Sequence, residues 1–150
     1  MRGEFRIDFD KKSLRDFEAA CEVAIRNVMT GSKKATTEAC EEILRNSKEQ
    51  VPTETTTLRQ SGFYEVNRRG DVKGYAYEGI IGYGGNGNPI NPKTGIAASE
   101  YMVAVHEDMT AVHPNGKAKF LEDPVREYAA NNFKRTVFTN MKESLADMSD

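Results

Sequence analysis

Hydrophobic residues in the first third of the chain shift from a spacing of two to a spacing of three and four. Phe5, Ile7 and Phe9 alternate with charged residues across 4–10, which predicts a short, half-buried strand. Candidate N-cap residues follow at 10–13. An amphipathic helix is then expected, with its apolar stripe formed by Leu14, Phe17, Cys21, Ala24 and Val28.

A second helix is predicted after Thr30-Gly31-Ser32, which interrupts or kinks the first one. Its apolar stripe spans residues 35–47. The helix is expected to stop near Val51, because a residue that precedes a proline resists the helical region.

The middle of the chain has the two-residue period of strands. Strands are expected at 63–67 and 75–83, joined by a hairpin turn at 68–71. The short apolar segment 101–106 is compatible with a strand or a helical turn. From 121 to 148 the apolar residues recur with helical spacing, which predicts one helix about 40 Å long at ~1.5 Å per residue.

This order of elements predicts the α+β class. We expect a small, mostly antiparallel sheet packed against two N-terminal helices and a long C-terminal helix. The 150 residues suit a single domain covering 1–150. Residues 84–98 contain GGNGNPINPKTG, whose glycines and prolines predict a long exposed loop.

Composition narrows the function classes. The chain is 38% hydrophobic and 29% charged, with a formal net charge of -2, so a broad basic field for nucleic acid is disfavoured. No apolar run approaches the ~20 residues that span a bilayer, and no membrane partner is expected. The cysteines, Cys21 and Cys40, are expected to be small buried thiols, with a disulfide between them left open.

Candidate chemistry is sparse. His106 and His113 lie in HEDMTAVH, where their spacing differs from the helical HExxH motif. A loop metal site formed by His106, Asp108 and His113 is one alternative, and hydrogen bonding at the ends of local elements is the other. No nucleophile elbow or phosphate-binding loop is present, so we expect neither an enzyme nor a cofactor.

Two basic pairs mark possible contacts with phosphates. Arg68 and Arg69 adjoin in the expected turn, and Lys117 and Lys119 flank another turn. They make these four residues candidates for facing DNA, and a nucleic-acid-binding accessory protein remains an alternative function. Solvated loop charge is the other interpretation of both pairs.

Three segments, taken together, carry a family resemblance. The first is VPTETTTLRQS at 51–61, the second is EYMVAVHE at 100–107, and the third is GKAKFLE at 116–122, followed by a proline and a helix. Their order resembles the small bacteriophage tail-component and neck proteins, over about 35–133. That family has P-x-[DE]-T-G-x-L-x-x-S, then YA-x-x-V-H-E, then K-F-L. This chain departs at Thr56, where the family has glycine, a residue that tolerates positive φ.

The resemblance implies a structural role at the head–tail junction of a phage. It implies a homo-oligomeric ring of 6 or 12 copies that contacts connector or head-closure proteins, the tail terminator or the tail tube. DNA would pass through the lumen without sequence readout. The subunit would be assembled in the host cytoplasm and located in the virion. A tail terminator that caps the tube is the close alternative.

Within this framework the motif residues are expected to form scaffold, with an interface role left open. The scaffold set is Pro52, Thr55, Leu58, Ser61, Tyr101, His106, Glu107, Phe120 and Leu121. We expect Tyr101, Val103 and Val105 to pack on one side. Contacts between subunits are instead expected from the N-terminal strand and the long loop. The candidate interface residues are Phe5, Ile7, Gly85, Asn86, Asn88, Pro89, Ile90, Asn91 and Lys93.

Overall fold

The chain folds as an α+β protein, as its sequence predicts. A computed structural model describes residues 8, 10–52, 56–71, 74–113 and 115–147. Within these residues the elements, in chain order, are α1 (Lys11–Gln50), α2 (Thr57–Gln60), β1 (Phe63–Asp71), β2 (Gly74–Gly82), α3 (Ala98–Glu107), α4 (Glu122–Asn131) and α5 (Phe133–Ala146). Of the expected N-terminal strand at 4–10, Phe5 and Ile7 lie outside the described residues, and Asp8 and Asp10 are described but belong to no strand.

A single helix, α1, replaces the two N-terminal helices that were expected. Asp10 caps it by accepting hydrogen bonds from the backbone N–H groups of Lys12 and Ser13, at 2.9 and 3.0 Å. Gly31 does not interrupt the helix, and its lack of a side chain allows α5 to pack closely against α1. A Cβ atom there would lie 2.7 Å from the carbonyl oxygen of Asn140 in α5. The helix ends where expected, at the extended residue Val51.

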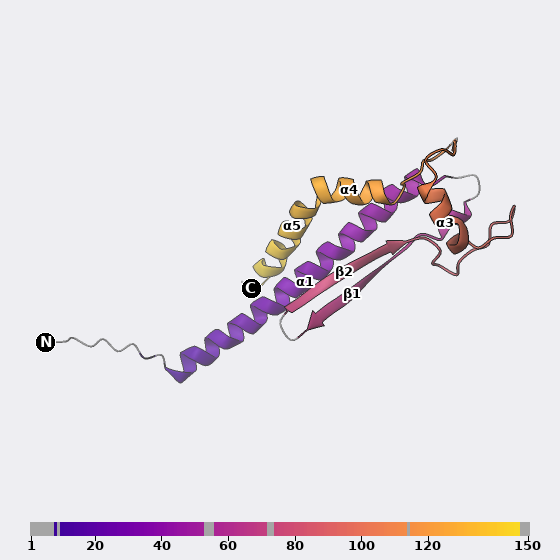
Figure 1. Cartoon of the computed structure of the whole chain (residues 1–150). Helices are drawn as coiled ribbons and strands as arrows, with labels where there is room; N and C mark the ends of the chain where they lie inside the picture. The colour runs from indigo at the N-terminus through magenta and orange to yellow at the C-terminus, as the bar shows by residue number, and fades with distance from the viewer. Residues whose placement is uncertain (1–7, 9, 53–55, 72–73, 114, 148–150) are drawn as a thin grey trace.

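The other elements gather along the C-terminal part of α1. Helices α4 and α5 lie on one side of it and the β1–β2 ribbon on the other, while the N-terminal part of α1 projects past them all (Figure 1). A two-stranded ribbon is marginal alone, so its packing against α1 stabilises it. Gly79 permits a close approach, since a Cβ there would lie 2.3 Å from the Cys40 sulfur.

The hairpin is longer than its hydrophobic pattern indicated. The antiparallel register runs from Phe63 opposite Gly82 to Asp71 opposite Gly74. The predicted turn at 68–71 was therefore wrong, because Arg68 and Arg69 continue β1. Pairing with β2 extends β1 through the polar residues 68–71, beyond the segment in which apolar and polar residues alternate.

The long C-terminal helix is also two helices. It breaks at Asn132, whose side-chain amide donates to the Glu42 carboxylate of α1 at 2.8 Å. Beyond this break α5 follows α1, joined by Asn140 donating to Glu38 at 2.7 Å and by the ion pair of Lys34 with Glu143. Hydrophobic spacing continues across the break, so periodicity alone predicted one helix.

The buried core lies at the C-terminal end of α1. Its members are Leu44, Val51, Leu58, Tyr83, Ala98 and Phe120. Segment 101–106 belongs to helix α3, so Tyr101 and Val105 pack on this core while Val103 is 61% exposed. The expectation that all three share one side was wrong, because residues two apart diverge on a helix.

The two cysteines are free thiols with different surroundings. Cys40 is buried, as expected, and Cys21 is only partly buried on the projecting part of α1. They lie 19 residues apart on one straight helix, about 28 Å at ~1.5 Å per residue. A disulfide within one chain is therefore excluded in this fold, since bridged Cα atoms lie ~4.4–6.8 Å apart.

Candidate functional site

The three motif segments, distant in sequence, meet at the C-terminal end of α1. Leu58 and Phe120 are 3% and 0% exposed and share one buried cluster with Val51. Leu121 packs partly buried beside them. The structure thus joins the motifs through their apolar residues.

Ser61 ties the first motif to the long loop. Its hydroxyl donates to the Leu58 carbonyl at 2.7 Å and accepts from the Gly84 N–H at 3.0 Å. Its own carbonyl accepts from the Gly85 N–H at 3.0 Å. The side chain is fully buried, so these bonds satisfy a hydroxyl that water does not reach.

The third motif begins in close contact with the backbone of Pro52. Gly116, at φ +127°, approaches so closely that a Cβ would lie 2.5 Å from the Pro52 nitrogen. The next N–H, of Lys117, donates to the Gln50 carbonyl at 3.0 Å. Thr56, the departure from the family pattern, has φ -70° and ψ -5°, so this turn needs no glycine. Thr55 lies outside the described residues.

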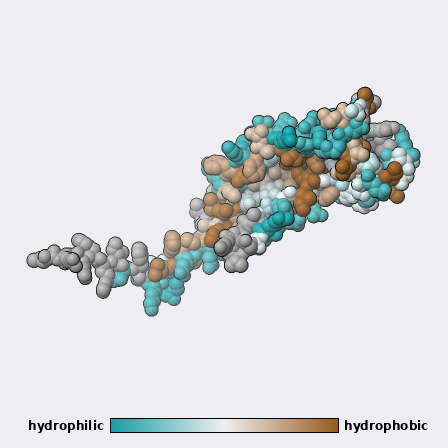
Figure 2. Space-filling view, in the orientation of Figure 1, coloured by the Kyte–Doolittle hydropathy of each residue, from teal (hydrophilic) through white to brown (hydrophobic). Residues whose placement is uncertain are grey.

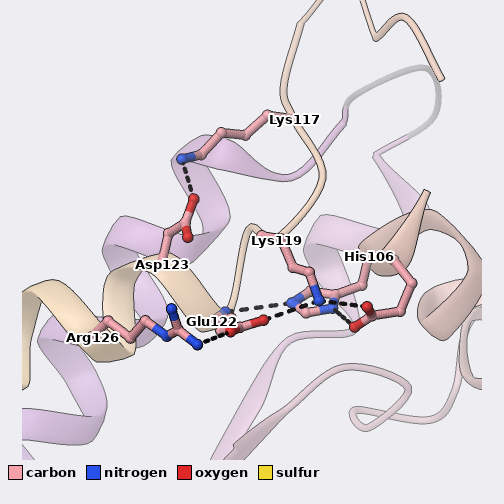
Figure 3. A network of polar contacts seen from close by, with 7 residues as sticks. His106, Lys117, Lys119, Glu122, Asp123 and Arg126 are labelled. Atoms are coloured by element: carbon pink, nitrogen blue, oxygen red, sulfur yellow. Dashed lines mark hydrogen bonds and ion pairs between the residues drawn. The ribbon is translucent and has the colours of Figure 1, made fainter. Parts of the chain in front are cut away.

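A polar network surrounds the junction of α3 and α4 (Figure 3). His106 Nε2 accepts from the Glu122 N–H at 3.4 Å, and its Nδ1 lies 2.7 Å from the Glu107 carboxylate. These contacts together favour the tautomer with the proton on Nδ1. The Lys119 ammonium pairs with Glu107 and, at 3.0 Å, with Glu122.

The charged groups in this network shift one another's pKa values. Lys119, and then His106, lower the pKa of Glu107, while Glu107 and then Glu122 raise the pKa of Lys119. Lys117 likewise lowers the pKa of Asp123, which it contacts at 2.5 Å. Lys119 has a left-handed backbone (φ 56°), and its N–H donates to the His106 carbonyl at 2.8 Å. The network therefore holds α3 against α4.

Below this network, aromatic rings pack edge to face. The centroid of the Phe120 ring lies 4.9 Å from that of the His106 ring and 5.2 Å from that of the Tyr83 ring. The Tyr83 hydroxyl lies 2.7 Å from the Ser47 hydroxyl, and burial raises the pKa of Tyr83 to about 12. His106 is thus a packed and hydrogen-bonded residue.

The possible metal site of His106, Asp108 and His113 does not form. Across the described ranges, no three His, Cys, Asp or Glu side chains come together as metal ligands do. One oxygen of Asp108 instead accepts from the Thr110 N–H, at 2.9 Å, and from the Ala111 N–H, at 3.1 Å. This carboxylate closes a local turn.

The loop at 84–98 is ordered by hydrogen bonds within it and by hydrogen bonds to Gly62 and Ser99. The Asn86 amide donates to the Gly62 carbonyl at 2.9 Å, and Asn88 exchanges two bonds with Ser99, at 2.8 and 2.9 Å. Both asparagines have left-handed backbones, which this residue type tolerates. Pro89 accepts from the Ala98 N–H, and Asn91 bonds Ile96 and Lys93. The exposed loop therefore has a defined shape in a single chain, with Ile90 64% exposed.

The four basic candidates do not form one patch. Arg68 and Arg69 lie near the hairpin end of β1, and Arg69 pairs with Glu78 at 2.7 Å. Lys117 and Lys119 lie at the other end of the fold, each paired with carboxylates. Neighbouring negative charge weakens the attraction of phosphates to these side chains.

One prominent feature escaped the sequence analysis. The N-terminal part of α1 carries large apolar side chains into solvent: Leu14 is 46% exposed, Phe17 67% and Ile25 56%. Figure 2 shows hydrophobic residues along this projection. The stripe was visible in sequence, but an amphipathic stripe is ordinarily covered by its own chain.

Two further apolar hollows flank α5. One, of about 560 Å³, lies between α1, β2, α4 and α5 and includes Ile43, Ile81 and Phe133. The other, of about 510 Å³, lies along the outer side of α5 and includes Phe138 and Leu145. Phe138 is 70% exposed. Such surfaces commonly mark contacts with other proteins.

No known protein family, curated protein or solved structure matches this chain. Among the residues that the structure describes, no helix has both the length and the apolar character to cross a membrane.

Proposed function

We propose that this chain is a structural subunit of a phage head–tail junction, where a ring of identical copies joins the connector to the tail. The resemblance of the three sequence motifs to phage neck proteins supports a position at the junction. Exposed apolar surfaces support the assembly role, and one of these surfaces is the main support for the proposal.

That surface is the projecting part of α1. Leu14, Phe17 and Ile25 lie in this N-terminal part of α1 and are between 46% and 67% exposed. Fully burying side chains of this size is worth about 1.5–3 kcal/mol each. A helix that presents such residues outside its fold is suited to burying them in an assembly.

The sheet offers a second site for assembly. In the described part of the chain, β1 and β2 pair only with each other, so each has an edge without a strand neighbour. Open edges readily accept a strand from another chain. The exposed loop beside them, with Ile90 at its surface, adds a third contact region.

Two experiments test the proposal. Native mass spectrometry and negative-stain imaging of the purified protein should show closed rings, and a persistent monomer at high concentration contradicts the assembly role. Removing the gene from its phage should leave full heads beside separate tails. Abnormally long tails would instead assign the chain as the tail terminator.

Nucleic-acid binding is the rival from another class. The ion pairs of Arg69, Lys117 and Lys119 argue against it. A salt titration with duplex DNA separates the two functions. Tight binding whose logarithm falls steeply with the logarithm of salt concentration favours the rival. Weak binding alongside ring formation favours the structural subunit.

A further inference from the structure

We propose that residues 4–9 of one copy add as a strand to the open edge of β2 in the next copy, with their apolar side chains filling the hollow beside that edge. These side chains are Phe5, Ile7 and Phe9. The hollow is the one of about 560 Å³ between α1, β2, α4 and α5, called the β2 groove below. This contact rests on the proposed ring function and names the two surfaces that join its subunits.

The β2 groove is apolar and is bordered by one strand of the ribbon. Among the residues that the structure describes, its lining includes Tyr77, Gly79 and Ile81 of β2 but no residue of β1 and no charged side chain. Helices α4 and α5 provide the opposite wall, on the other side of α1 (Figure 1). Hydrophobic residues gather in this region (Figure 2). Apolar side chains that enter the groove therefore bury no charge of the groove itself.

The edge of β2 is open beside this groove. Across the described ranges β2 pairs with β1 alone. Gly79 is exposed although a Cβ on it would lie 2.3 Å from the Cys40 sulfur, so solvent reaches the backbone in the middle of the strand. An added strand pairs the backbone groups of such an edge and fills the groove at once. A docked helix would fill the groove but leave these groups unpaired.

The N-terminal segment matches the groove in period and in length. Phe5, Ile7 and Phe9 alternate with charged residues, so a strand formed there has one apolar side and one charged side. From Phe5 to Phe9 an extended chain spans about 13 Å, at ~3.3 Å per residue. The groove-facing positions of β2, from Tyr77 to Ile81, span the same length. Three apolar side chains can therefore lie beside three groove-facing positions.

The segment cannot reach the β2 groove of its own chain. Ser32 is the first residue of α1 that lines the groove, and it lies about 33 Å along the helix from the cap at Asp10, at ~1.5 Å per residue. The chain from Asp10 back to Glu4 spans at most about 22 Å, at ~3.6 Å per residue. Pairing of this segment with β2 must therefore join two copies. In the single chain Asp8 and Asp10 belong to no strand, as a strand that awaits its partner requires.

The contact joins two different surfaces of identical chains. Such a head-to-tail contact repeats from copy to copy and closes into a ring when the rotation permits. The start of α1 lies well outside the body of its own chain (Figure 1), which leaves the segment free to enter the groove of a neighbour.

The first experiment changes the two sides of the segment separately. The double variant F5S/I7S removes apolar side chains that enter the groove, and it should weaken self-association on the order of tenfold or more in native mass spectrometry. The matched control R6S/D8S changes the alternate residues, which face away from the groove, and should assemble as wild type does. At concentrations where both are monomeric, F5S/I7S should melt at the wild-type temperature, because the segment does not pack on its own chain.

The second experiment blocks the groove. Ala129→Trp places a large side chain on the groove wall and should also weaken self-association, whereas Ala130→Trp, exposed on the same helix outside the lining, should not. Neither F5S/I7S nor A129W should form rings alone. An equimolar mixture should form a one-to-one heterodimer, because only the segment of A129W and the groove of F5S/I7S remain intact.

Hydrogen exchange then locates the contact in the wild-type assembly. Backbone amides of residues 4–9 and of β2 should gain protection at concentrations where rings form, and F5S/I7S should lose that gain. Protection that appears on other elements but not on these two overturns the contact.

The outcomes separate the contact from the ring. A wild-type chain that stays monomeric overturns both the contact and the proposed function. Rings of normal stability in F5S/I7S overturn the contact alone. Loss of rings in A129W together with normal rings in F5S/I7S assigns the groove to another occupant and overturns the contact. A lower melting temperature of monomeric F5S/I7S shows that the segment packs on its own chain, which also overturns it.

Discussion

Gly31 of α1 lies against the backbone of Asn140 in α5, so closely that a Cβ atom on Gly31 would lie 2.7 Å from the Asn140 carbonyl oxygen. The same Cβ would lie 2.9 Å from the Cα atom of Met141. Both obstacles are backbone atoms, which cannot rotate away. The residue that resembles a helix breaker in sequence is therefore the point where two helices approach.

Gly31→Ala tests this close approach. Alanine favours a helix interior by about 1 kcal/mol over glycine, whereas overpacking costs about 1–3 kcal/mol. We expect the clash to dominate and the free energy of unfolding to fall by about 1 kcal/mol or more, measured by urea denaturation. Exposed Thr30→Ala should stay within about 0.5 kcal/mol of wild type. A more stable G31A protein contradicts the packing.

The buried hydroxyl pair of Ser47 and Tyr83 provides a second test. Tyr83→Phe leaves the fully buried Ser47 hydroxyl without this partner, which should cost about 1–3 kcal/mol of stability. Ser47→Ala in the same protein should recover part of the loss, and the double-mutant cycle measures the coupling. Tyr64→Phe is the control, because its hydroxyl bonds the exposed Glu41. Equal effects of the two Tyr→Phe changes argue against the buried bond.

Tyr83 should also titrate late. Burial raises its pKa from 10.0 to about 12, so the folded state holds this proton at pH values where the unfolded state has lost it. The resulting stability is complete below pH 10 and is lost as pH rises toward 12. Phenolate absorbance during alkaline titration should include a late component that disappears in Tyr83→Phe. Identical titration curves for the two proteins contradict this.

Acid sensitivity should depend partly on Glu107. Lys119, and secondarily His106, lower the pKa of this carboxyl below its ordinary value of 4.5. The stability from the pairing is present above pH 4.5 and is lost as pH falls through the lowered pKa. Melting temperature should therefore fall less steeply on acidification in Glu107→Gln than in wild type. High salt should shrink the difference, since the pair is exposed. Parallel acid profiles count against the pairing.

The loop surface makes a prediction about assembly alone. Ile90 is 64% exposed on a loop whose hydrogen bonds come from other residues. Ile90→Asp should change monomer stability by less than about 0.5 kcal/mol yet weaken ring formation in native mass spectrometry. Val112→Asp, at a site 91% exposed outside the loop, serves as the control. Unchanged rings in Ile90→Asp remove the loop from the interface.

The sequence by itself determined which regions are helix and which are strand, and some of the residues that become buried. Period-two alternation located both strands, and the proline after Val51 located the end of α1. Leu58 and Phe120, which were expected to be scaffold residues, are buried. These features depend on neighbouring residues and on hydrophobicity, which a single sequence carries directly.

Tertiary contacts decided the rest. Gly31 lies within a continuous helix, and its lack of a side chain allows α5 to pack close to it. The break between α4 and α5 lies at Asn132, whose side-chain amide donates to the Glu42 carboxylate of α1. The motif residue Ser61 gains its role from Gly84, 23 positions later. The stripe at Leu14 and Phe17 was legible as amphipathic, but its exposure depends on where α5 ends in space (Figure 1). Local spacing encodes which faces are apolar, whereas only the folded chain determines which of them remain uncovered.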